Sequence, residues 1–355
     1  MKTFIIQKDD IKSKKWKEGA KAFNIDMFIQ SGSPIKAPFF LIKTILYNKK
    51  PDGYIVRYLN DYSSFFKTIL RLFSEILLVV LCLVFKIDIF WICHNVDKET
   101  SSKYMKISEF RRWLFSKFSK KIFVTDALLV EFAKNVFKKE EEKIDYISFG
   151  KINSNSAFDT DEIHIAINHI EEQQIIAFER KLIPLVVFCV GSTGTKYLHF
   201  NLLNDLIEKS LGNKYYLIPV LAGEFNKTDE GKQLLKVYKD INQILTFKEY
   251  TKFSNIFIKE YVDFYWRVYD DWSVPFTLYE STALKKPILT KNIKFLPKIV
   301  LEENIGYVLM DNWNNLKDCL YKISTKKELN YNNFLENRTW NILGKKLLEY
   351  ANDNK

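Results

Sequence analysis

Glu280 is the first residue whose type and position suggest chemistry. It lies in the stretch FYWRVYDDWSVPFTLYESTALKKPILT, residues 264–290, where the sequence predicts a strand, a loop, a helix and a second strand. Thr277 stands three positions before Glu280, and this Thr-x-x-Glu spacing is a capping box that predicts a helix with Thr277 as its N-cap. A helix N-terminus that follows the end of a strand can bind an anion. Spacing alone, however, favours a Glu280 that only caps its own helix.

A second stretch, LVVFCVGSTGTKYLHF at 185–200, predicts a buried strand, a turn rich in glycine and hydroxyl side chains, and then a helix. Backbone amides at the start of a helix, together with one lysine, suit a diphosphate. Taken alone, the turn could be an ordinary strand-to-helix connection with a surface lysine. Its pairing with the Glu280 segment favours a phosphate site, with four candidate residues: Gly191, Ser192, Thr193 and Lys196.

His94 and Asn95 end the apolar segment IDIFWIC at 87–93. Residues that follow a parallel strand lie at the edge of the sheet where ligands bind, so we expect both side chains to face a cleft. A single histidine at such a position can also be purely structural, with one ring nitrogen satisfied.

The elements that must position these residues alternate between strands and helices. Helical patterns separate apolar segments rich in Ile, Val, Phe and Tyr, and this alternation predicts parallel α/β sheets. Several segments are apolar on both faces, as strands covered by helices are. The predicted strands are 3–7, 53–59, 87–93, 121–125, 144–148, 184–190, 215–222, 243–249, 263–269 and 287–290.

A polar stretch followed by an amphipathic helix at 151–181 separates two groups of strands. We therefore predict an N-terminal Rossmann-like domain at 1–160 and a second at 161–332. The two would face each other across a cleft lined by the C-terminal ends of their strands. A helix at 333–355 would complete the chain and could pack back on the N-terminal domain.

Composition limits the class of protein. The 355 residues are 47% hydrophobic and 27% charged, which is ordinary for a globular chain with two cores. The four cysteines form no CxxC pair, and three lie in apolar runs, which predicts buried thiols in a reducing compartment. No signal-peptide core follows the N-terminus. The apolar run 76–85 is shorter than the roughly 20 residues of a membrane span and predicts a buried helix.

The formal net charge of +11 favours anionic partners, although lysine is scattered along the whole chain. Metal binding is not expected. The sequence Asp-Thr-Asp at 159–161 has the form of a metal-binding motif, but it lies in the predicted interdomain linker rather than after a strand.

The segment ESTALKKPIL, 280–289, resembles the E-A-x-A-x-G-x-P-V segment of GT-B glycosyltransferases. In that family the glutamate binds the ribose of the donor nucleotide, which implies this role for Glu280, and small residues such as Ser281 let the helix approach the phosphates. The preceding strand also resembles the family's, with Asp263 at its aspartate. Trp272 replaces an earlier family glutamate, Lys285 replaces the glycine, and the loop offers Asp270, Asp271 and Ser273 instead.

The turn after residue 190 resembles the family's G-R-x-x-x-x-K motif. Lys196 follows Gly191 by one residue fewer than in the family, and Ser192 replaces the arginine. The resemblance implies that these residues and the Thr277 helix hold the donor diphosphate. It also implies a nucleotide base near Phe247 and Lys248.

The stretch 87–100 resembles the W-T-x-H-N-x-x-x-H-E segment of bacterial GT-B enzymes that build surface polysaccharides. His94 and Asn95 keep that pattern, and Glu99 stands near its glutamate. The segment IDYISFG resembles the family's V-I-P-H-G, with Phe149 at the histidine and Gly150 kept. The resemblance implies that His94 contacts the transferred sugar or the acceptor. Glu99, or an aspartate of QKDDIKSKK at 7–15, would be the base of an inverting enzyme, whereas a retaining enzyme needs none.

The activity implied is transfer of a sugar from a nucleotide-diphosphate donor to a glycan or lipid-linked acceptor in bacterial surface polysaccharide biosynthesis (capsule, O-antigen or exopolysaccharide). No cofactor or metal is expected, because GT-B enzymes hold the diphosphate with amides and lysines. We expect a cytoplasmic protein, with peripheral binding to the inner face of the cell membrane as an option.

Basic and aromatic residues mix at 103–121, and this mixture suits a membrane interface. The predicted membrane face consists of Arg111, Arg112, Trp113 and Lys117. An amphipathic helix packed on a sheet, with solvated charges, accounts for the pattern equally well.

Two other functions remain open from the sequence. A sugar-nucleotide epimerase on the same scaffold would share the ribose glutamate and the diphosphate site but need no acceptor. A non-catalytic protein that binds anionic lipid or nucleic acid would account for the net charge. No nucleic-acid-binding module is recognisable, however, and the basic residues are dispersed.

Overall fold

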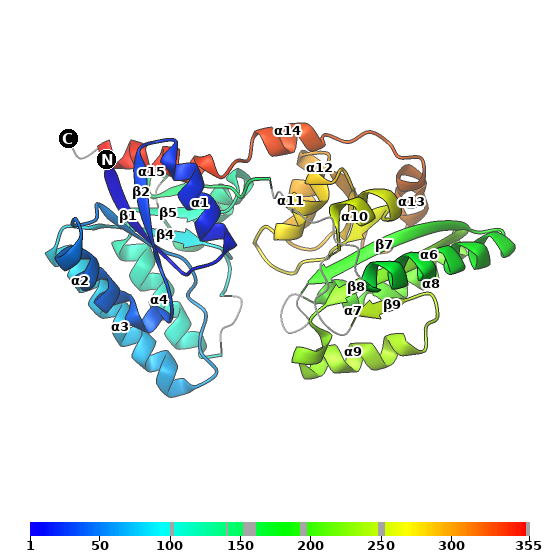
Figure 1. Cartoon of the computed structure of the whole chain (residues 1–355), viewed down its shortest axis with the longest axis horizontal. Coiled ribbons are helices and arrows are strands. Elements are labelled where there is room, and N and C mark those ends of the chain that lie inside the picture. The colour runs from blue at the N-terminus through cyan, green and yellow to red at the C-terminus, as the bar shows by residue number, and fades with distance from the viewer. Residues whose placement is uncertain (100–102, 140, 152–160, 192–196, 248–252, 353–355) are drawn as a thin grey trace. The chain divides into compact units, whose positions relative to one another are not determined.

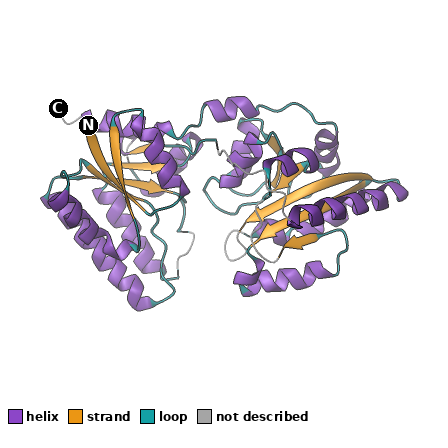
Figure 2. Ribbon diagram, viewed as in Figure 1, coloured by secondary structure: helices purple, strands orange, loops and turns teal. Residues whose placement is uncertain are grey.

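The computed structural model describes residues 1–99, 103–139, 141–151, 161–191, 197–247 and 253–352. Figure 1 shows the order of its elements, and Figure 2 shows strands flanked by helices in each half of the chain. The chain divides into two compact units. Unit 1 comprises Met1–Gly150, Trp272–Val274 and Arg338–Lys355, and unit 2 comprises Lys151–Asp271 and Pro275–Asn337. The first division therefore falls after residue 150, whereas the sequence analysis placed it after residue 160.

Unit 1 contains a six-stranded sheet in the order β2-β1-β3-β4-β5-β6, and all its strand pairs are parallel. Five of its strands match predicted segments. The sixth, β2, was not predicted, because Asp26 and Gln30 interrupt its short apolar pattern. The strands are β1 Lys2–Gln7, β2 Ile25–Gln30, β3 Gly53–Val56, β4 Asp88–Cys93, β5 Lys121–Val124 and β6 Ile144–Tyr146.

The helices of unit 1 cover both faces of this sheet. The chain steps outward one way from β1 to β2 and the other way from β3 to β6. Right-handed crossovers therefore place α1 on one face and α2 to α5 on the other. Helix α15 packs against α1, while α2, α3 and α4 lie together (Figure 1). The helices are α1 Ile11–Lys21, α2 Ala37–Tyr47, α3 Phe65–Val84, α4 Met105–Phe118, α5 Val130–Phe137 and α15 Asn341–Asn352.

Unit 2 repeats this plan with the order β12-β11-β10-β7-β8-β9, again all parallel. Its core gathers apolar side chains from β7, β8 and β10 and from helices such as α8 and α13. The strands are β7 Ile183–Gly191, β8 Tyr215–Gly223, β9 Leu245–Phe247, β10 Phe264–Trp266, β11 Ile288–Lys291 and β12 Gly306–Leu309. The helices are α6 Asp161–Glu179, α7 Leu198–Asn201, α8 Leu203–Gly212, α9 Asp229–Lys239, α10 Asn255–Tyr261, α11 Phe276–Ala283, α12 Leu296–Glu302, α13 Leu316–Ser324 and α14 Tyr331–Glu336.

The predicted C-terminal helix is two helices, α14 in unit 2 and α15 in unit 1. Between them the chain is held to unit 1, where Nε of Arg338 donates to Oδ2 of Asp126 over 2.7 Å. Trp340 packs against Trp16 and Phe149, with ring centroids 5.8 and 5.9 Å apart. A Cβ on Gly150 would lie 2.5 Å from Cδ1 of Trp340, so the close approach of the C-terminal segment requires this glycine.

The apolar run 76–85 lies in α3, and the prediction of a buried helix holds for only one of its faces. Leu78, Val79 and Cys82 are buried, whereas Leu77 and Val80 are exposed. No helix within the described ranges is both long and apolar enough to cross a membrane. All four cysteines are buried, including the three for which apolar surroundings predicted it.

Candidate functional site

The two central strands of the unit 2 sheet, β7 and β10, lie side by side, and the chain steps away from them in opposite directions. Ligands of open parallel sheets bind at such a switch point, beyond the C-terminal ends of the strands. Gly191 ends β7, and Arg267 is the first residue after β10. The unit 2 site is therefore built from these two residues outward.

Arg267 carries a buried positive charge, with 5% of the residue exposed. Its Nη1 donates to the carbonyl oxygen of Val190 over 2.5 Å and to Nε2 of His199 over 2.7 Å. Its Nη2 donates to the Tyr269 hydroxyl over 3.0 Å. Nε has no hydrogen-bond partner among the residues described. A cation held this rigidly at a sheet's switch point suits an anionic ligand group.

Gly191 is fitted to this guanidinium. Its φ of +150° is rarely adopted by residues with side chains, and a Cβ added there would overlap Nη1 of Arg267. The other predicted residues of this turn, Ser192, Thr193 and Lys196, lie outside the described residues, as does Lys248. Phe247 is described: it ends β9 half-buried, with its ring 5.3 Å from that of Phe253.

The predicted capping box is wrong. Helix α11 begins at Phe276 with Pro275 as its N-cap, because the fixed φ of proline, here −71°, suits the residue that leads into a helix. Thr277 is the second helical residue, and its buried Oγ1 lacks a hydrogen-bond partner in the described part of the chain. Glu280 consequently lies inside the helix rather than at its first turn. Ser281 is buried, and its Oγ donates to the carbonyl oxygen of Leu278 over 3.1 Å.

The carboxylate of Glu280 does not cap α11, because the N-cap of this helix is Pro275. Its Oε1 accepts a hydrogen bond from the Tyr265 hydroxyl over 3.4 Å. Burial raises the pKa of Glu280 to about 6, and the bond from Tyr265 offsets only part of that rise. A carboxylate that is costly to bury and only weakly bonded can accept hydrogen bonds from a ligand's hydroxyl groups.

The loop before α11 holds Ser273, one of the predicted donor-binding residues. Ser273 is buried and belongs to unit 1 together with Trp272. The indole of Trp272 stacks on Phe132 with ring centroids 3.5 Å apart, and its carbonyl oxygen accepts from the Val96 amide over 3.0 Å. Trp272 thus anchors the loop to unit 1. Lys285, at the position of the family's glycine, has a φ of +55°, the conformation that glycine adopts most easily.

Unit 1 has its own switch point, between β1 and β3. Arg57 follows β3 and is buried, and its Nη1 lies 2.7 Å from Oδ1 of Asp10. Asp10 also caps α1 by accepting from the Ser13 amide over 2.9 Å. Burial would raise the pKa of Asp10, but the charge and hydrogen bond of Arg57 outweigh it and lower the pKa. The aspartate is therefore held ionised beside the end of the sheet.

Aromatic rings surround His94 at the same edge. The imidazole stacks on Tyr58 with centroids 4.3 Å apart and planes at 8°, and its centroid lies 6.2 Å from that of Phe149. Nζ of Lys8 is 4.4 Å from the Tyr58 ring, and Nζ of Lys12 is 4.4 Å from the Phe149 ring. These flat, partly polar faces and flanking cations form a surface suited to a polar ring-shaped or anionic ligand.

Asn95 is buried beside His94, and neither atom of its side-chain amide has a hydrogen-bond partner within the described residues. Its backbone carbonyl oxygen accepts from Nη1 of Arg112 over 3.1 Å. Satisfied amides are the rule in protein interiors, so this one is a candidate to bind a ligand.

Glu99 was predicted as a base, and the two arginines of α4 as part of a membrane face, but all three form ion pairs inside unit 1. Glu99 pairs with Arg112 over 2.6 Å and is buried, with the pKa of its carboxyl raised by that burial despite the arginine. Arg111 is fully buried and bonds to Glu75 over 2.6 Å and to Asp61 over 3.0 Å. Neither arginine is available to a membrane, and Glu99 is engaged with a structural partner. Trp113 and Lys117 are exposed, as a membrane face would require.

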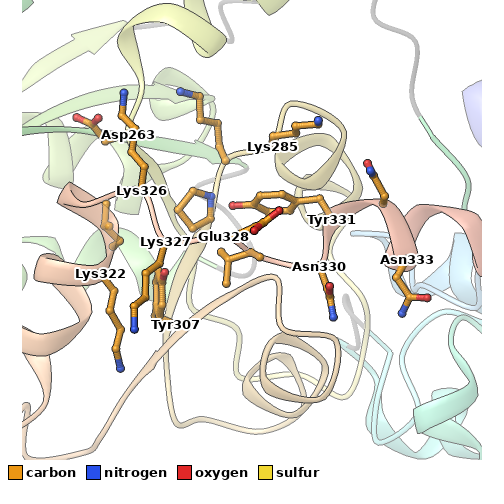
Figure 3. Close-up of a pocket in the computed structure, with 15 residues that line it drawn as sticks. Asp263, Lys285, Tyr307, Lys322, Lys326, Lys327, Glu328, Asn330, Tyr331 and Asn333 are labelled. Atoms are coloured by element: carbon orange, nitrogen blue, oxygen red, sulfur yellow. The ribbon is translucent and has the colours of Figure 1, made fainter.

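A pocket of about 400 Å³ lies at the opposite edge of the unit 2 sheet (Figure 3). Asp263 and Pro287, which line it, immediately precede β10 and β11. The carboxylate of Asp263 accepts from the Val186 amide over 2.7 Å, so this residue supports the start of the sheet. The pocket is therefore separate from the Gly191–Arg267 site.

Sequence reasoning missed Arg57 and Arg267, the two buried cations at the switch points. Both lie inside segments that were assigned wholly to strands, GYIVRYL and DFYWRVY. A signal was present, because in each segment one arginine interrupts an apolar run near its C-terminal end. It also assigned the 7–15 aspartates to a loop, whereas Asp10 caps a helix.

No protein-family model matches the chain, and no curated protein matches its sequence. Solved structures do match over nearly the full length. WaaG, a glycosyltransferase involved in lipopolysaccharide biosynthesis, is 13% identical with a TM-score of 0.59, and 99% of each chain is covered. HepE of Anabaena, solved with UDP, is 10% identical with a TM-score of 0.59, covering 99% of this chain and 100% of that one. The UDP-GlcNAc 2-epimerase of Methanocaldococcus jannaschii is 15% identical with a TM-score of 0.55, covering 99% of both. This likeness and the two parallel sheets confirm the predicted GT-B-type α/β fold with two Rossmann-like units.

Proposed function

We propose that this chain is a glycosyltransferase that moves a sugar from a nucleotide-diphosphate donor to a glycan or lipid-linked acceptor. The observation that carries the proposal is the buried guanidinium of Arg267 beside Gly191, at the switch point of the unit 2 sheet. Negative charge develops on the diphosphate as it leaves the sugar. A cation that is already fixed in place stabilises this charge without having to move. Arg267 would take the place of the arginine that Ser192 replaces in the family motif.

Glu280 would bind the ribose. Its carboxylate is partly buried and, within the described part of the chain, accepts one long hydrogen bond, from Tyr265. Two adjacent hydroxyl groups of a ribose would supply stronger bonds to it. The nucleotide base would lie near Phe247, at the end of β9.

Unit 1 would bind the acceptor through His94 and Asn95. The carboxylates proposed from the sequence as the base are all paired with cations: Glu99 with Arg112, Asp10 with Arg57 and Asp9 with Lys14. We therefore favour a retaining reaction on the front face of the sugar, in which the leaving diphosphate takes the acceptor's proton. No metal or cofactor is part of this proposal.

The biosynthesis of bacterial surface polysaccharide remains the proposed pathway, and the inner face of the cell membrane the proposed location. WaaG acts in lipopolysaccharide biosynthesis, which supports an acceptor of this class. HepE was solved with UDP, which supports a uridine donor as the first to test.

The test is a thermal-shift screen of the purified protein against UDP, GDP, dTDP, ADP, CMP and their common sugars, first without metal and then with magnesium. We expect stabilisation by one diphosphate family without metal. The variant Arg267→Gln should lose that stabilisation, whereas Arg180→Gln, at an exposed residue just after α6 in the same unit, should keep it. Circular dichroism would show that both variants are folded. No shift with any nucleotide would refute the donor site.

An epimerase is the second candidate, because the archaeal UDP-GlcNAc 2-epimerase shares the fold. The two activities separate in one experiment. The preferred nucleotide sugar is incubated without any acceptor, and the products are resolved by chromatography. Formation of an epimeric sugar nucleotide would establish the epimerase, whereas a transferase forms no epimer and transfers the sugar only when an acceptor is supplied.

A further inference from the structure

Helix α3 exposes apolar residues along its whole length, while its buried face is polar in the first part of the helix and apolar only from Leu78 onward. Its inner face buries four polar residues: Thr68, Arg71, Ser74 and Glu75. Its outer face exposes an apolar row at helical spacing: Phe66, Leu70, Phe73, Leu77, Val80 and Val84. In a helix that faces water the apolar stripe is turned toward the core. The outer row of α3 therefore exposes apolar side chains where a helix that faces water usually has polar ones.

The polar inner face fixes which way α3 is turned. Arg71 donates to Glu75 over 2.8 Å, Glu75 accepts from Arg111 of α4 over 2.6 Å, and Arg111 reaches Asp61 over 3.0 Å. Rotating α3 to hide its outer row would break this buried ion-pair network, which costs several kilocalories per mole in proteins generally. The exposure of the row is thus built into the fold.

Neighbouring helices extend the apolar surface. Helix α2 packs against α3 and exposes Phe39, Ile42 and Leu46, of which Phe39 and Leu46 are 69% and 72% exposed. Helix α4 also packs against α3, and it exposes Phe110 and Trp113. Figure 1 shows the three helices grouped at one side of unit 1. Soluble monomers rarely expose contiguous apolar areas of more than a few hundred Å².

The charges on this surface select the partner. Helices α2 and α3 are described in full, and their only carboxylate is the buried Glu75, while α4 adds one exposed carboxylate, Glu109. Exposed lysines stand on and around the apolar rows: Lys36, Lys43, Lys67, Lys86, Lys106 and Lys117. Nζ of Lys117 lies 5.1 Å from the ring of Trp113, a pairing suited to the headgroup region. Apolar rows edged by cations fit a bilayer that carries anionic headgroups.

We propose that the exposed faces of α2 and α3, with Trp113 and Lys117 of α4, form a surface that docks unit 1 on an anionic phospholipid bilayer. The apolar rows enter the interface, and the lysines contact the headgroups. This surface replaces the one predicted from the sequence, which relied on Arg111 and Arg112. It stands apart from the proposed transferase function, because lipid binding requires no donor.

Vesicle co-sedimentation tests the proposal, with phosphatidylcholine vesicles and with vesicles that also contain phosphatidylglycerol. The full-length protein should bind the mixed vesicles and bind pure phosphatidylcholine much more weakly. The triple variant Leu70→Gln, Phe73→Gln and Leu77→Gln should lose binding. A matched triple variant on α6 of unit 2, Ile165→Gln, Ile175→Gln and Phe178→Gln, removes equally exposed apolar groups and should bind as the parent does.

Reversing the charge of single lysines measures the electrostatic contribution to vesicle binding separately from the apolar one. Each of Lys43→Glu and Lys67→Glu should weaken binding to mixed vesicles by about fivefold or more, equivalent to about 1 kcal/mol per charge. The controls Lys236→Glu and Lys239→Glu, exposed on α9 of unit 2, should have little effect. Melting curves would show that each variant is folded.

Two outcomes would overturn the proposal. One is binding of the α3 triple variant equal to that of the parent protein. The other is a parent protein that binds neither vesicle type. If that protein also forms a dimer by light scattering, and the α3 triple variant abolishes the dimer, the surface is a contact between two copies of the chain.

Discussion

The guanidinium of Arg267 occupies the space that a side chain on Gly191 would need. The two residues are 76 positions apart in the chain, yet β7 and β10 pair as neighbours and bring their C-terminal ends together. The guanidinium of Arg267 can therefore take its buried position only because residue 191 is a glycine. It lies where a parallel sheet of this topology binds its ligand.

Gly191→Ala should displace Arg267 and force an unfavourable φ. We expect affinity for the preferred nucleoside diphosphate to fall by at least about tenfold, the effect of losing one charge-assisted hydrogen bond. Isothermal titration calorimetry would measure it. The control is Gly212→Ala at the end of α8, where an added Cβ meets nothing within 4 Å. Equal affinity in the two variants would remove Arg267 from the donor site.

Glu280→Gln should stabilise the ligand-free protein while weakening nucleotide binding. Burial raises the pKa of Glu280 from 4.5 to about 6, so the ionised form is penalised in the folded state. The penalty is absent below pH 4.5 and complete above pH 6. Relative to the parent, the variant should gain up to about 2 kcal/mol of unfolding free energy at pH 7.5 and nothing at pH 4.

Denaturant titrations at both pH values would measure this gain, and Glu260→Gln, exposed on α10, is the matched control. For the same reason, nucleotide affinity of the parent protein should decline as the pH falls below about 6, as the carboxylate becomes protonated. Unchanged affinity in Glu280→Gln would contradict the ribose-binding role.

His94→Ala should lower turnover and leave donor affinity intact, because His94 belongs to unit 1 and the donor residues belong to unit 2. Losing the ring that stacks on Tyr58 should misplace the acceptor and reduce turnover by about tenfold to a hundredfold. Steady-state kinetics and donor titration would separate the two quantities. Full activity, equal to that of the exposed control His164→Ala, would reduce His94 to a structural role.

Arg111→Leu should destabilise the protein, because it leaves Glu75 and Asp61 buried without their shared cation. Removing one partner of a buried ion pair costs about 3–5 kcal/mol. The pKa of Glu75 is lowered from 4.5: burial would raise it, but the two arginines outweigh burial. Its stabilising contribution is present above pH 4.5 and is lost as the pH falls through the lowered pKa.

The difference between Arg111→Leu and the parent protein should therefore shrink in acid. Urea titrations at neutral pH and in acid would test this, and Lys106→Ala on the exposed side of α4 should change stability by less than about 0.5 kcal/mol. If Arg111→Leu is as stable as Lys106→Ala, the network does not hold α3 in its orientation.

The sequence by itself determined the α/β architecture, because apolar runs and turn residues report the local environment of each strand. Ten strands were located this way, and a polar stretch led to a predicted boundary at residue 160, where the structure divides the chain at residue 150. It also identified Gly191 and His94 as site candidates from their positions at the ends of strands, and Glu280 from the resemblance of its helix segment to that of GT-B glycosyltransferases. Local signals of this kind need no knowledge of distant contacts.

Tertiary structure decided which charges are buried and which face of a helix meets solvent. Arg111 resembles any basic residue of an amphipathic helix until Glu75, 36 positions earlier, is placed against it. Arg267 resembles a strand residue until β7 brings the carbonyl oxygen of Val190 to its guanidinium. In both cases a charge is tolerated inside the protein only because a partner from a distant segment compensates for its lost hydration, and no local pattern encodes that partner.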